Sequence, residues 1–336
     1  MPSPRATRIA TRTAQSTAQS TARRVLRRIG IASGACALLA AGCTAWWLRD
    51  PEPVFARRTG TLETVTEGPI VRDGGMEEQE VRIVSTTGLS VTMAIRRPAT
   101  DDGGGTVTRR QTFLVLGGQQ RGKGAAALIG DTRGTVFASL DYPYDGDRSA
   151  KGISVIAQVP AIRRALYDTP PAVSLALDYL LERPDVDHDR LELVGASFGA
   201  PFATIAAARD DRVRRLWIAH GGGDPFAMID TGLVREIPFA PLRWPVSALA
   251  TLLASGPRLA PEHWVGRVSP RPVVMLNALD DERIPRRSVD VLWAAVREPR
   301  EQVWLPGRHM QGDRPDVLRM LVDSVMARAL TPAVPR

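Results

Sequence analysis

The sequence LELVGASFGA, residues 191–200, places one serine between two glycines directly after an apolar run. The run is typical of a buried strand, and the small residues that begin at Ala200 predict a helix. A strand that passes into a helix through Gly-x-Ser-x-Gly forms a nucleophile elbow, a sharp turn that exposes the serine hydroxyl above the end of the strand. We therefore predict Ser197 as a nucleophile, with the backbone N–H of Phe198 directed at a developing oxyanion.

A serine hydroxyl is a poor nucleophile near neutral pH and needs a general base. The chain has four histidines. His188 precedes the elbow strand and is expected at the opposite end of the sheet, whereas His220 ends a strand and His263 lies in a long insertion. His309 follows the last predicted strand, in a loop at the carboxyl edge, where ligands meet parallel sheets. We predict that His309 is the base.

The base in turn needs a carboxylate to orient it. The segment RPVVMLNALDDERIP, residues 271–285, supplies Asp280 and Asp281 just after another predicted strand. Either carboxylate could reach the imidazole. The order serine, aspartate, histidine along the chain is the one expected when a strand-to-helix elbow holds the nucleophile.

Strands and helices alternate through most of the chain. Helical patterns cover residues 153–184, where prolines are expected to break the helix, and residues 315–330. Continuously apolar strands that alternate with helices predict an α/β fold, with a mostly parallel sheet and helices on both faces. A hairpin is expected before them, at residues 81–99. The strand-like runs are residues 112–118, 134–143, 191–195, 213–223, 271–279 and 301–307.

One long connection, at about residues 224–268, interrupts this alternation. A connection of this length usually has structure of its own, so we expect a helical cap insertion. Its larger apolar side chains are expected to shape an acyl pocket. They are Phe226, Met228, Phe239, Leu242, Trp244 and Leu253.

Three segments together resemble the α/β-hydrolase superfamily, in particular its dienelactone-hydrolase-like, acetyl-xylan-esterase-like and prolyl-oligopeptidase-like branches. They are VDHDRLELVGASFGA, SPRPVVMLNALDDERIP and GRHM, and the resemblance covers roughly residues 80 to 330. The resemblance implies acyl transfer to water through an acyl-serine, with His309 as base and then acid. The family's acid usually stands four residues before the proline, which selects Asp281 when counted back from Pro285.

The resemblance also implies a first oxyanion donor in the loop after the third strand of the sheet. That loop is LGGQQRG, in which Gly117 stands where the family often has a histidine. The alignment gives the N–H of Gln119 as the donor, beside Gly118. No metal or organic cofactor is implied, and the expected partner is a small acyl substrate.

Other functions fit parts of the sequence. GGQQRGKG, residues 117–124, follows the P-loop pattern but ends in Gly124, where a P-loop needs Ser or Thr for Mg²⁺. A peptidase of the prolyl-oligopeptidase type is an alternative enzyme, although the chain lacks room for a large N-terminal propeller between the predicted membrane segment and the third strand. A hydrolase fold that only binds ligands is a further alternative, because fold does not fix function.

The charge of the chain is concentrated at its N-terminus. The chain has 336 residues and a formal net charge of +8, yet seven of its 44 basic residues lie within residues 1–48, which contain no acid. The remaining 37 basic residues nearly balance the 36 acidic ones. A nucleic-acid surface would be spread over the folded part, so we predict no nucleic-acid partner.

The N-terminal residues predict export or membrane attachment. Residues 1–28 are basic and repetitive and are expected to be disordered, whereas residues 29–48 are uncharged and long enough to span a bilayer. An uncleaved anchor, a cleaved signal and a lipoprotein signal acylated at Cys43 are all open, and each places the body outside the cytoplasm, in the bacterial periplasm or cell envelope. We expect a linker at residues 49–75 and the hydrolase domain at residues 76–332.

Overall fold

The computed structural model describes residues 50–99, 107–118 and 121–329, together with residues 27, 34, 38, 41 and 42. The folded unit begins at Pro51. Nearly all of the predicted membrane segment, residues 29–48, lies outside the described residues, so the expectation about it stays a prediction. Among the residues that are described, no helix is long and apolar enough to cross a membrane.

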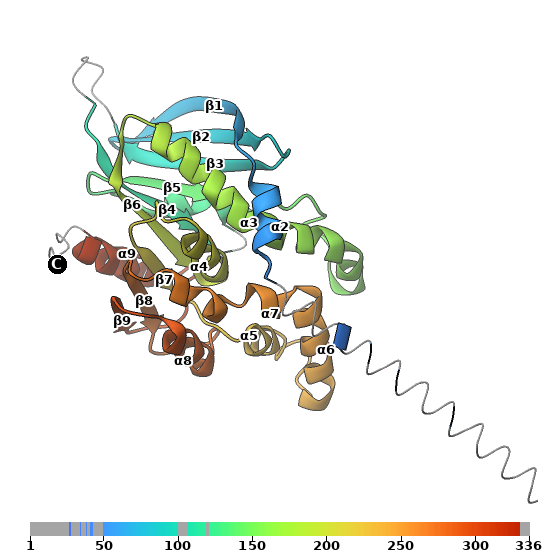
Figure 1. Cartoon of the computed structure of the whole chain (residues 1–336). Coiled ribbons are helices and arrows are strands. Elements are labelled where there is room, and N and C mark those ends of the chain that lie inside the picture. Colours follow the sequence, from blue (N-terminus) through green and yellow to red (C-terminus); the bar gives the residue numbers. More distant parts are fainter. Residues whose placement is uncertain are drawn as a thin grey trace, which may run out of the picture. The chain divides into compact units, whose positions relative to one another are not determined.

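The described strands form one nine-stranded sheet in the order β1-β2-β3-β5-β4-β6-β7-β8-β9 (Figure 1). β1, β2, β3 and β5 pair in antiparallel fashion, and every pairing from β5 through β4 to β9 is parallel. The predicted α/β class with a mostly parallel sheet is therefore confirmed. The bounds are β1 Leu62–Asp73, β2 Met76–Ser85, β3 Ser90–Pro98, β4 Arg110–Leu116, β5 Val136–Leu140, β6 Val186–Ala196, β7 Leu216–Ala219, β8 Val273–Ala278 and β9 Arg300–Leu305.

Helices cover both faces of this sheet. Side chains alternate along each strand, so Leu114 and Leu193 belong to one hydrophobic cluster and Val115 and Val194 to another. The first cluster includes residues of α3 (Val155–Glu182), α4 (Ala200–Arg209) and α8 (Arg286–Ala295). The second includes residues of the 3₁₀ helix η1 (Gly122–Leu128) and of α9 (Pro315–Ala329).

The expected linker is the largest error in the predicted organisation. Residues within it form α2 (Glu52–Thr59) and β1, the edge strand that pairs with the predicted hairpin of β2 and β3. β1 is almost entirely exposed, so its residues lack the apolar alternation by which a strand is usually found. The charged and glycine-rich composition therefore reflects a solvated edge rather than a flexible connection.

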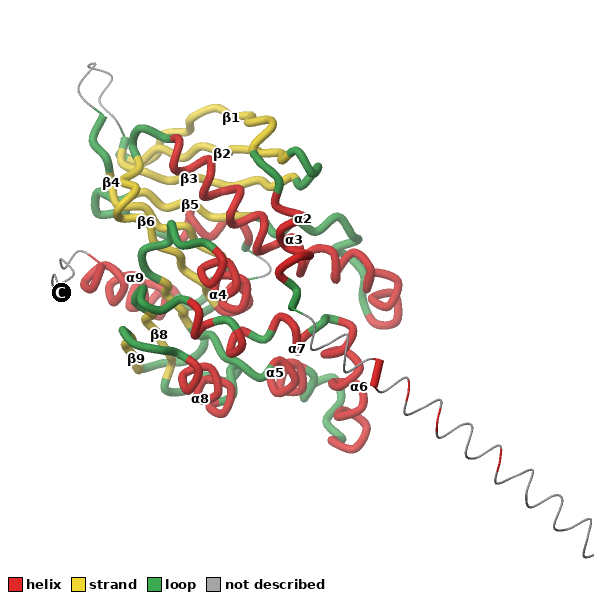
Figure 2. The backbone as a smooth tube through the Cα atoms, in the orientation of Figure 1, coloured by secondary structure: helices red, strands yellow, loops and turns green. Residues whose placement is uncertain are grey.

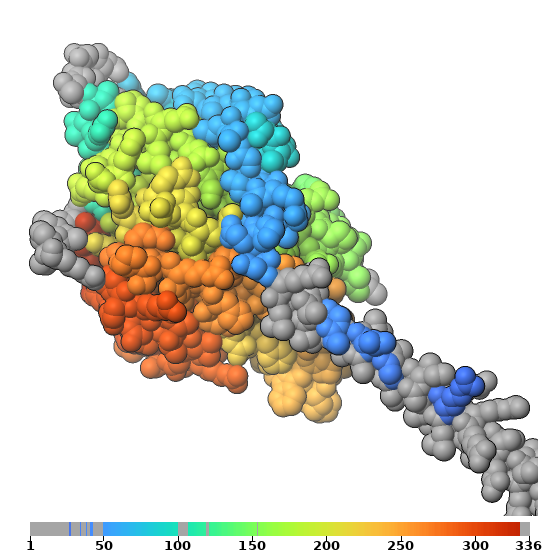
Figure 3. Space-filling view, viewed as in Figure 1, coloured from blue at the N-terminus to red at the C-terminus, as the bar shows by residue number. Residues whose placement is uncertain are grey.

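The helix α2 packs onto the body through a single large side chain. Phe55 is fully buried, and its ring contacts the rings of Tyr167 and Trp264. Ion pairs flank it, one between Arg209 and Glu52 at 2.9 Å and one between Arg58 and Asp168. Figure 3 shows this segment lying on the surface of the body.

The sequence predicts that prolines break the helix at residues 153–184, but α3 is continuous. α3 runs for 28 residues and contains Pro160, Pro170 and Pro171. Pro170 and Pro171 are both buried. The packing of this part of the helix outweighs the backbone hydrogen bonds that the prolines remove, because tertiary contacts can override helix propensity.

The predicted cap insertion is helical, as expected. It consists mainly of α5 (Pro225–Gly232), α6 (Ala240–Leu253) and α7 (Gly256–Leu259), which follow β7 (Figure 2). Short 3₁₀ turns at Pro261–His263 and Val265–Arg267 then lead the chain to β8.

Candidate active site

The elbow at Ser197 is a strained turn that only small neighbours allow. Ser197 has a φ of +52°, in the left-handed region that L-residues rarely adopt. A Cβ on Gly199 would lie 2.1 Å from the carbonyl oxygen of Leu116, and a Cβ on Gly195 would lie 2.7 Å from the Cβ of Ala203. The two glycines therefore permit the close approach of the helix to the sheet that exposes the hydroxyl.

The structure brings the predicted serine, histidine and one aspartate into direct contact. The hydroxyl Oγ of Ser197 lies 2.8 Å from Nε2 of His309, and Nδ1 of His309 lies 2.9 and 3.0 Å from the two carboxylate oxygens of Asp281. His309 is only 1% exposed. Asp280 is exposed, and its backbone N–H donates to the carbonyl of Gly307. Of the two aspartates, Asp281 is thus the one at the imidazole.

The carboxylate of Asp281 is held in its ionised form. Burial favours the neutral acid, but the hydrogen bond and charge of His309 and the backbone N–H groups of Ile284 and Arg283 outweigh it. The pKa of Asp281 therefore lies below its ordinary value. An ionised acceptor at this position fixes the proton of His309 on Nδ1 and leaves Nε2 free to accept from the serine.

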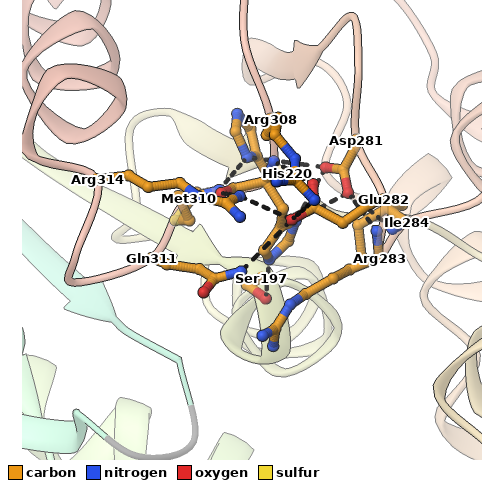
Figure 4. A network of polar contacts seen from close by, with 11 residues as sticks. Ser197, His220, Asp281, Glu282, Arg283, Ile284, Arg308, Met310, Gln311 and Arg314 are labelled. Carbon is orange, nitrogen blue, oxygen red and sulfur yellow. Dashed lines mark hydrogen bonds and ion pairs between the residues drawn. The ribbon is translucent and has the colours of Figure 1, made fainter. Parts of the chain in front are cut away.

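A second acid fixes the backbone of the histidine loop. Glu282 accepts the backbone N–H of His309 at 3.0 Å and pairs with Arg314 at 2.7 Å and with Arg308 at 3.3 Å (Figure 4). Burial alone would raise the pKa of Glu282, but these hydrogen bonds and the nearby arginine lower it to about 2. No local sequence pattern identifies this residue, because its partners come together only in the fold.

His220 is the other residue that the sequence analysis does not place in the site. It follows β7 with a φ of +50°, and its Nδ1 accepts the backbone N–H of Met310 at 2.9 Å. Its ring centre lies 5.3 Å from that of His309. Burial, together with the nearby charge of His309, lowers the pKa of His220 to about 4, so the ring is neutral near pH 7. The only sequence signal was a histidine at the end of a strand.

His220, Asp281 and His309 also offer potential metal ligands, since their ligand atoms all lie within 4.8 Å of one another. Three of the atoms already have partners. Nδ1 of His309 bonds to Asp281, Nε2 of His309 bonds to Ser197, and Nδ1 of His220 accepts from Met310. A cation here would have to displace the hydrogen bonds that join these residues, so the set fits proton transfer better than metal binding.

Of the two predicted oxyanion donors, the structure describes Phe198, which lies beside this cluster. Phe198 directly follows Ser197, and Gly118 lines the same cavity, whereas Gln119 lies outside the described residues. The hydroxyl of Tyr142 donates to the carbonyl of Gly117, and burial raises the pKa of Tyr142, which keeps this donor protonated. That hydrogen bond holds the start of the glycine loop.

The described residues of this loop, 117–118 and 121–124, do not have the arrangement of a P-loop. Lys123 of η1 pairs with Glu80 at 2.6 Å, and its backbone N–H donates to Asp141. The loop leads into a 3₁₀ helix of seven residues, whereas a P-loop leads into an α-helix whose N-terminus faces the phosphates. The nucleotide-binding alternative is therefore not supported.

Ser197 and His309 line a cavity of about 670 Å³. The cap contributes little to it: of the six apolar cap residues predicted to shape an acyl pocket, only Met228 lines this cavity. Phe239, Leu242 and Trp244 are 68%, 59% and 58% exposed and do not line it. Its apolar lining comes mainly from the sheet, η1 and α9 instead.

The matches to curated proteins cover only part of the chain. No protein-family model matches the chain. The uncharacterized protein YfhR of Salmonella typhimurium is 27% identical over 161 residues, which are 48% of this chain and 52% of that protein. The YfhR protein of Salmonella typhi matches over the same shares. The chain thus spans about half the length of the curated relatives that it matches.

Solved structures match over most of the chain. An acetyl xylan esterase from Paenibacillus sp. R4 superposes with a TM-score of 0.58 at 14% identity, over 78% of this chain and 89% of that one. A cold-adapted esterase from an Arctic intertidal metagenomic library gives a TM-score of 0.53 at 17% identity, over 79% and 99%. Acetyl xylan esterase 1 from Thermoanaerobacterium sp. gives 0.53 at 14% identity, over 84% and 93%. Together with the nine-stranded sheet, these likenesses identify the chain as a protein of the α/β-hydrolase fold.

Proposed function

We propose that this protein is a serine hydrolase that cleaves carboxylic esters. The observation that supports the proposal most directly is the continuous hydrogen-bonded line from Ser197 through His309 to Asp281 at the wall of a large cavity. The solved neighbours with a similar fold, two acetyl xylan esterases and an esterase, support ester substrates.

In the proposed reaction, Nε2 of His309 takes the proton of Ser197 as Oγ attacks the ester carbonyl carbon. The carbonyl oxygen becomes negative and is stabilised by the N–H of Phe198 and by a donor from the glycine loop. His309 then gives its proton to the leaving alcohol, and the acyl group remains on Ser197. Water, deprotonated by the same imidazole, then attacks the acyl carbon. The bond between this carbon and Oγ breaks, His309 returns the proton to Oγ, and the carboxylic acid leaves.

We also propose that the uncharged segment at residues 29–48 exports the body or attaches it to the membrane, with the body outside the cytoplasm. The support is the sequence alone: arginines precede the segment and no charge lies within it. Protease protection in intact cells tests this directly. A body that resists added protease until the cytoplasmic membrane is permeabilised would contradict it.

A fluorophosphonate probe tests the proposed chemistry, because it labels only a serine whose hydroxyl is activated by a base. We expect the wild-type protein to be labelled and Ser197→Ala to be unlabelled. Ser149→Ala, at an exposed serine, serves as the matched control and should be labelled like the wild type. A folded wild-type protein that takes no label would favour a binding protein without catalysis.

A further inference from the structure

The cavity at Ser197 extends away from the cap, into the layer between the sheet and α9. Its walls include residues of four neighbouring strands, namely Val115, Phe137, Val194, Ala196 and Ala219. From α9 they include Leu318, Leu321, Val322, Val325 and Met326, and from η1 Ala125 and Leu128. The space therefore penetrates one of the two hydrophobic layers of the domain.

The accessible surface of the strand residues shows the same hollow independently. Val194 is 9% exposed, whereas Leu193, its neighbour facing the other side of the sheet, is fully buried. Val115 and Leu114 differ in the same way, at 8% and 0%. At these positions the strand residues are fully buried on the sheet face that packs against α3 and α4. On the face that packs against α9 they are partly accessible, which leaves space for a ligand.

The hollow follows from the element that covers this part of the sheet. η1 is a seven-residue 3₁₀ helix, and such short pieces cover less of a sheet than an α-helix does. Leu128 at its end is 37% exposed. On the opposite face, residues of the 28-residue α3 share a hydrophobic cluster with residues of β3, β4, β5 and β6. The gap thus lies between η1 and α9.

The chemistry of the walls changes along the cavity. Charged lining residues are confined to loops, and they are Arg121, Arg283 and Asp313. Figure 4 shows Arg283 extending toward Ser197 from the loop that follows Asp281. The walls formed by the strands and by α9 are apolar. One end thus suits the polar ester and alcohol, and the other suits hydrocarbon, because burial of an unpaired polar group would be unfavourable there.

The length of the apolar part sets the size of the occupant. Leu318 to Met326 spans about 12 Å of helix at 1.5 Å per residue. Val194 precedes Ser197 by three residues, or about 10 Å of strand. An extended chain advances roughly 1.2 Å per backbone atom, so about eight to ten carbons fill this depth.

We propose that this cavity binds the acyl chain of a medium-chain ester, of about eight to ten carbons, between α9 and strands β4, β5 and β6. The inference rests on the proposed function, because the group that becomes bonded to Ser197 must occupy space that is continuous with its hydroxyl. It places the acyl chain in the layer beneath η1 and α9 rather than under the cap.

A chain-length series of p-nitrophenyl esters tests the substrate class. We expect kcat/KM for the decanoate to exceed that for the acetate by at least about tenfold, since each buried methylene favours binding by roughly fourfold. Val325→Phe should fill the cavity and lower kcat/KM about tenfold more for the decanoate than for the acetate. Val322→Phe, at a partly buried lining residue, repeats the test if Val325→Phe fails to fold.

Val246→Phe on α6 is the matched control, because Val246 is 37% exposed and does not line the cavity. It should leave the chain-length profile unchanged. A wild-type enzyme that hydrolyses acetate no worse than decanoate, with a profile that neither cavity variant alters, would overturn the inference and leave ester hydrolysis intact.

Binding without turnover separates the two proposals. Ser197→Ala should bind sodium decanoate in isothermal titration calorimetry, and adding Val322→Phe should weaken that binding by about tenfold. If the wild-type protein has no hydrolase activity, but decanoate binding to Ser197→Ala is weakened by Val322→Phe, the result would support the site and contradict the proposed function. An active enzyme whose Ser197→Ala variant binds no decanoate would contradict the site alone.

Discussion

Nδ1 of His220 accepts the backbone N–H of Met310 at 2.9 Å, which joins the end of β7 to the residue that follows His309. His309 is thereby held from two sides, because Glu282 accepts its own backbone N–H. In the proposed reaction the imidazole must stay within hydrogen-bond distance of both Ser197 and Asp281, so we expect His220 to act as a positioning residue for the loop.

Replacement of His220 tests this role. His220→Asn keeps a side chain that tolerates a positive φ but is too short to hold the loop in place. We expect kcat to fall by about tenfold with KM nearly unchanged, because the substrate cavity stays intact while His309 is less well aligned. His263→Asn, at a histidine of the cap, is the control. An equal loss of kcat in both variants would argue against positioning.

The buried His220 also makes stability depend on pH. An unfolded histidine titrates near pH 6.5 and His220 in the fold near 4, so the unfolded chain binds the extra proton between these values. The free energy of unfolding should therefore fall by up to about 3 kcal/mol as pH drops from 6.5 to 4. Urea unfolding across this range should show a smaller fall in His220→Asn, and equal slopes would contradict the lowered pKa.

The two neighbouring aspartates differ in their contacts and should differ in their effects. Asp281→Asn removes the ionised acceptor that fixes the tautomer of His309, so we expect kcat for ester hydrolysis to fall by about a thousandfold or more. Asp280→Asn changes an exposed side chain and should leave kcat within about twofold. Steady-state kinetics measure kcat for both variants. A larger loss of kcat in Asp280→Asn than in Asp281→Asn would identify Asp280 as the acid that orients His309.

The elbow glycines predict a steric effect on folding. Gly199→Ala would bring a methyl group to 2.1 Å from the carbonyl oxygen of Leu116, so we expect a loss of about 3 kcal/mol or more, or no folded protein. Gly130→Ala is the control, because no atom lies within 4 Å of its added methyl group. Thermal unfolding of the two variants measures the difference. Comparable melting temperatures would mean that the elbow is less crowded than described.

Glu282 should stabilise the fold through its charge. Its pKa is lowered from 4.5 to about 2, so its contribution is present above pH 4.5 and is lost as pH falls toward 2. We expect Glu282→Gln to reduce the free energy of unfolding by about 1 to 3 kcal/mol at pH 7. The difference from wild type should shrink below pH 4.5. The exposed Glu236→Gln should have no effect, and a constant difference at all pH values would exclude a charge effect.

The sequence predicts those parts of the fold that local patterns determine. The elbow at Ser197, the loop with Asp281 and the loop with His309 each follow an apolar strand, and parallel strands bring their carboxyl ends to one edge. The edge strand β1 escapes detection because it is exposed on both faces. Contacts that depend on packing between distant segments, such as those of His220 and Glu282, leave no mark in a local window.

The cavity shows the same limit in another form. Apolar residues in the cap suggest a pocket there, but hydropathy does not say which surface a side chain faces. Trp244 is 58% exposed, whereas Val194 lines the hollow under α9. The hollow is set by how little of the sheet η1 covers, which is a property of packing rather than of any one residue.

The packing of α2 against the body constrains the order in which parts of the protein can fold. Phe55 emerges early during synthesis, but Trp264, against which it packs, emerges only after most of the sheet has been made. Until then Phe55 has no complete site and remains in water. Because contacts between residues so distant in the chain form late and slowly, the burial of Phe55 would report the end of folding. A fluorescence change at Trp264 is therefore expected in the slowest refolding phase.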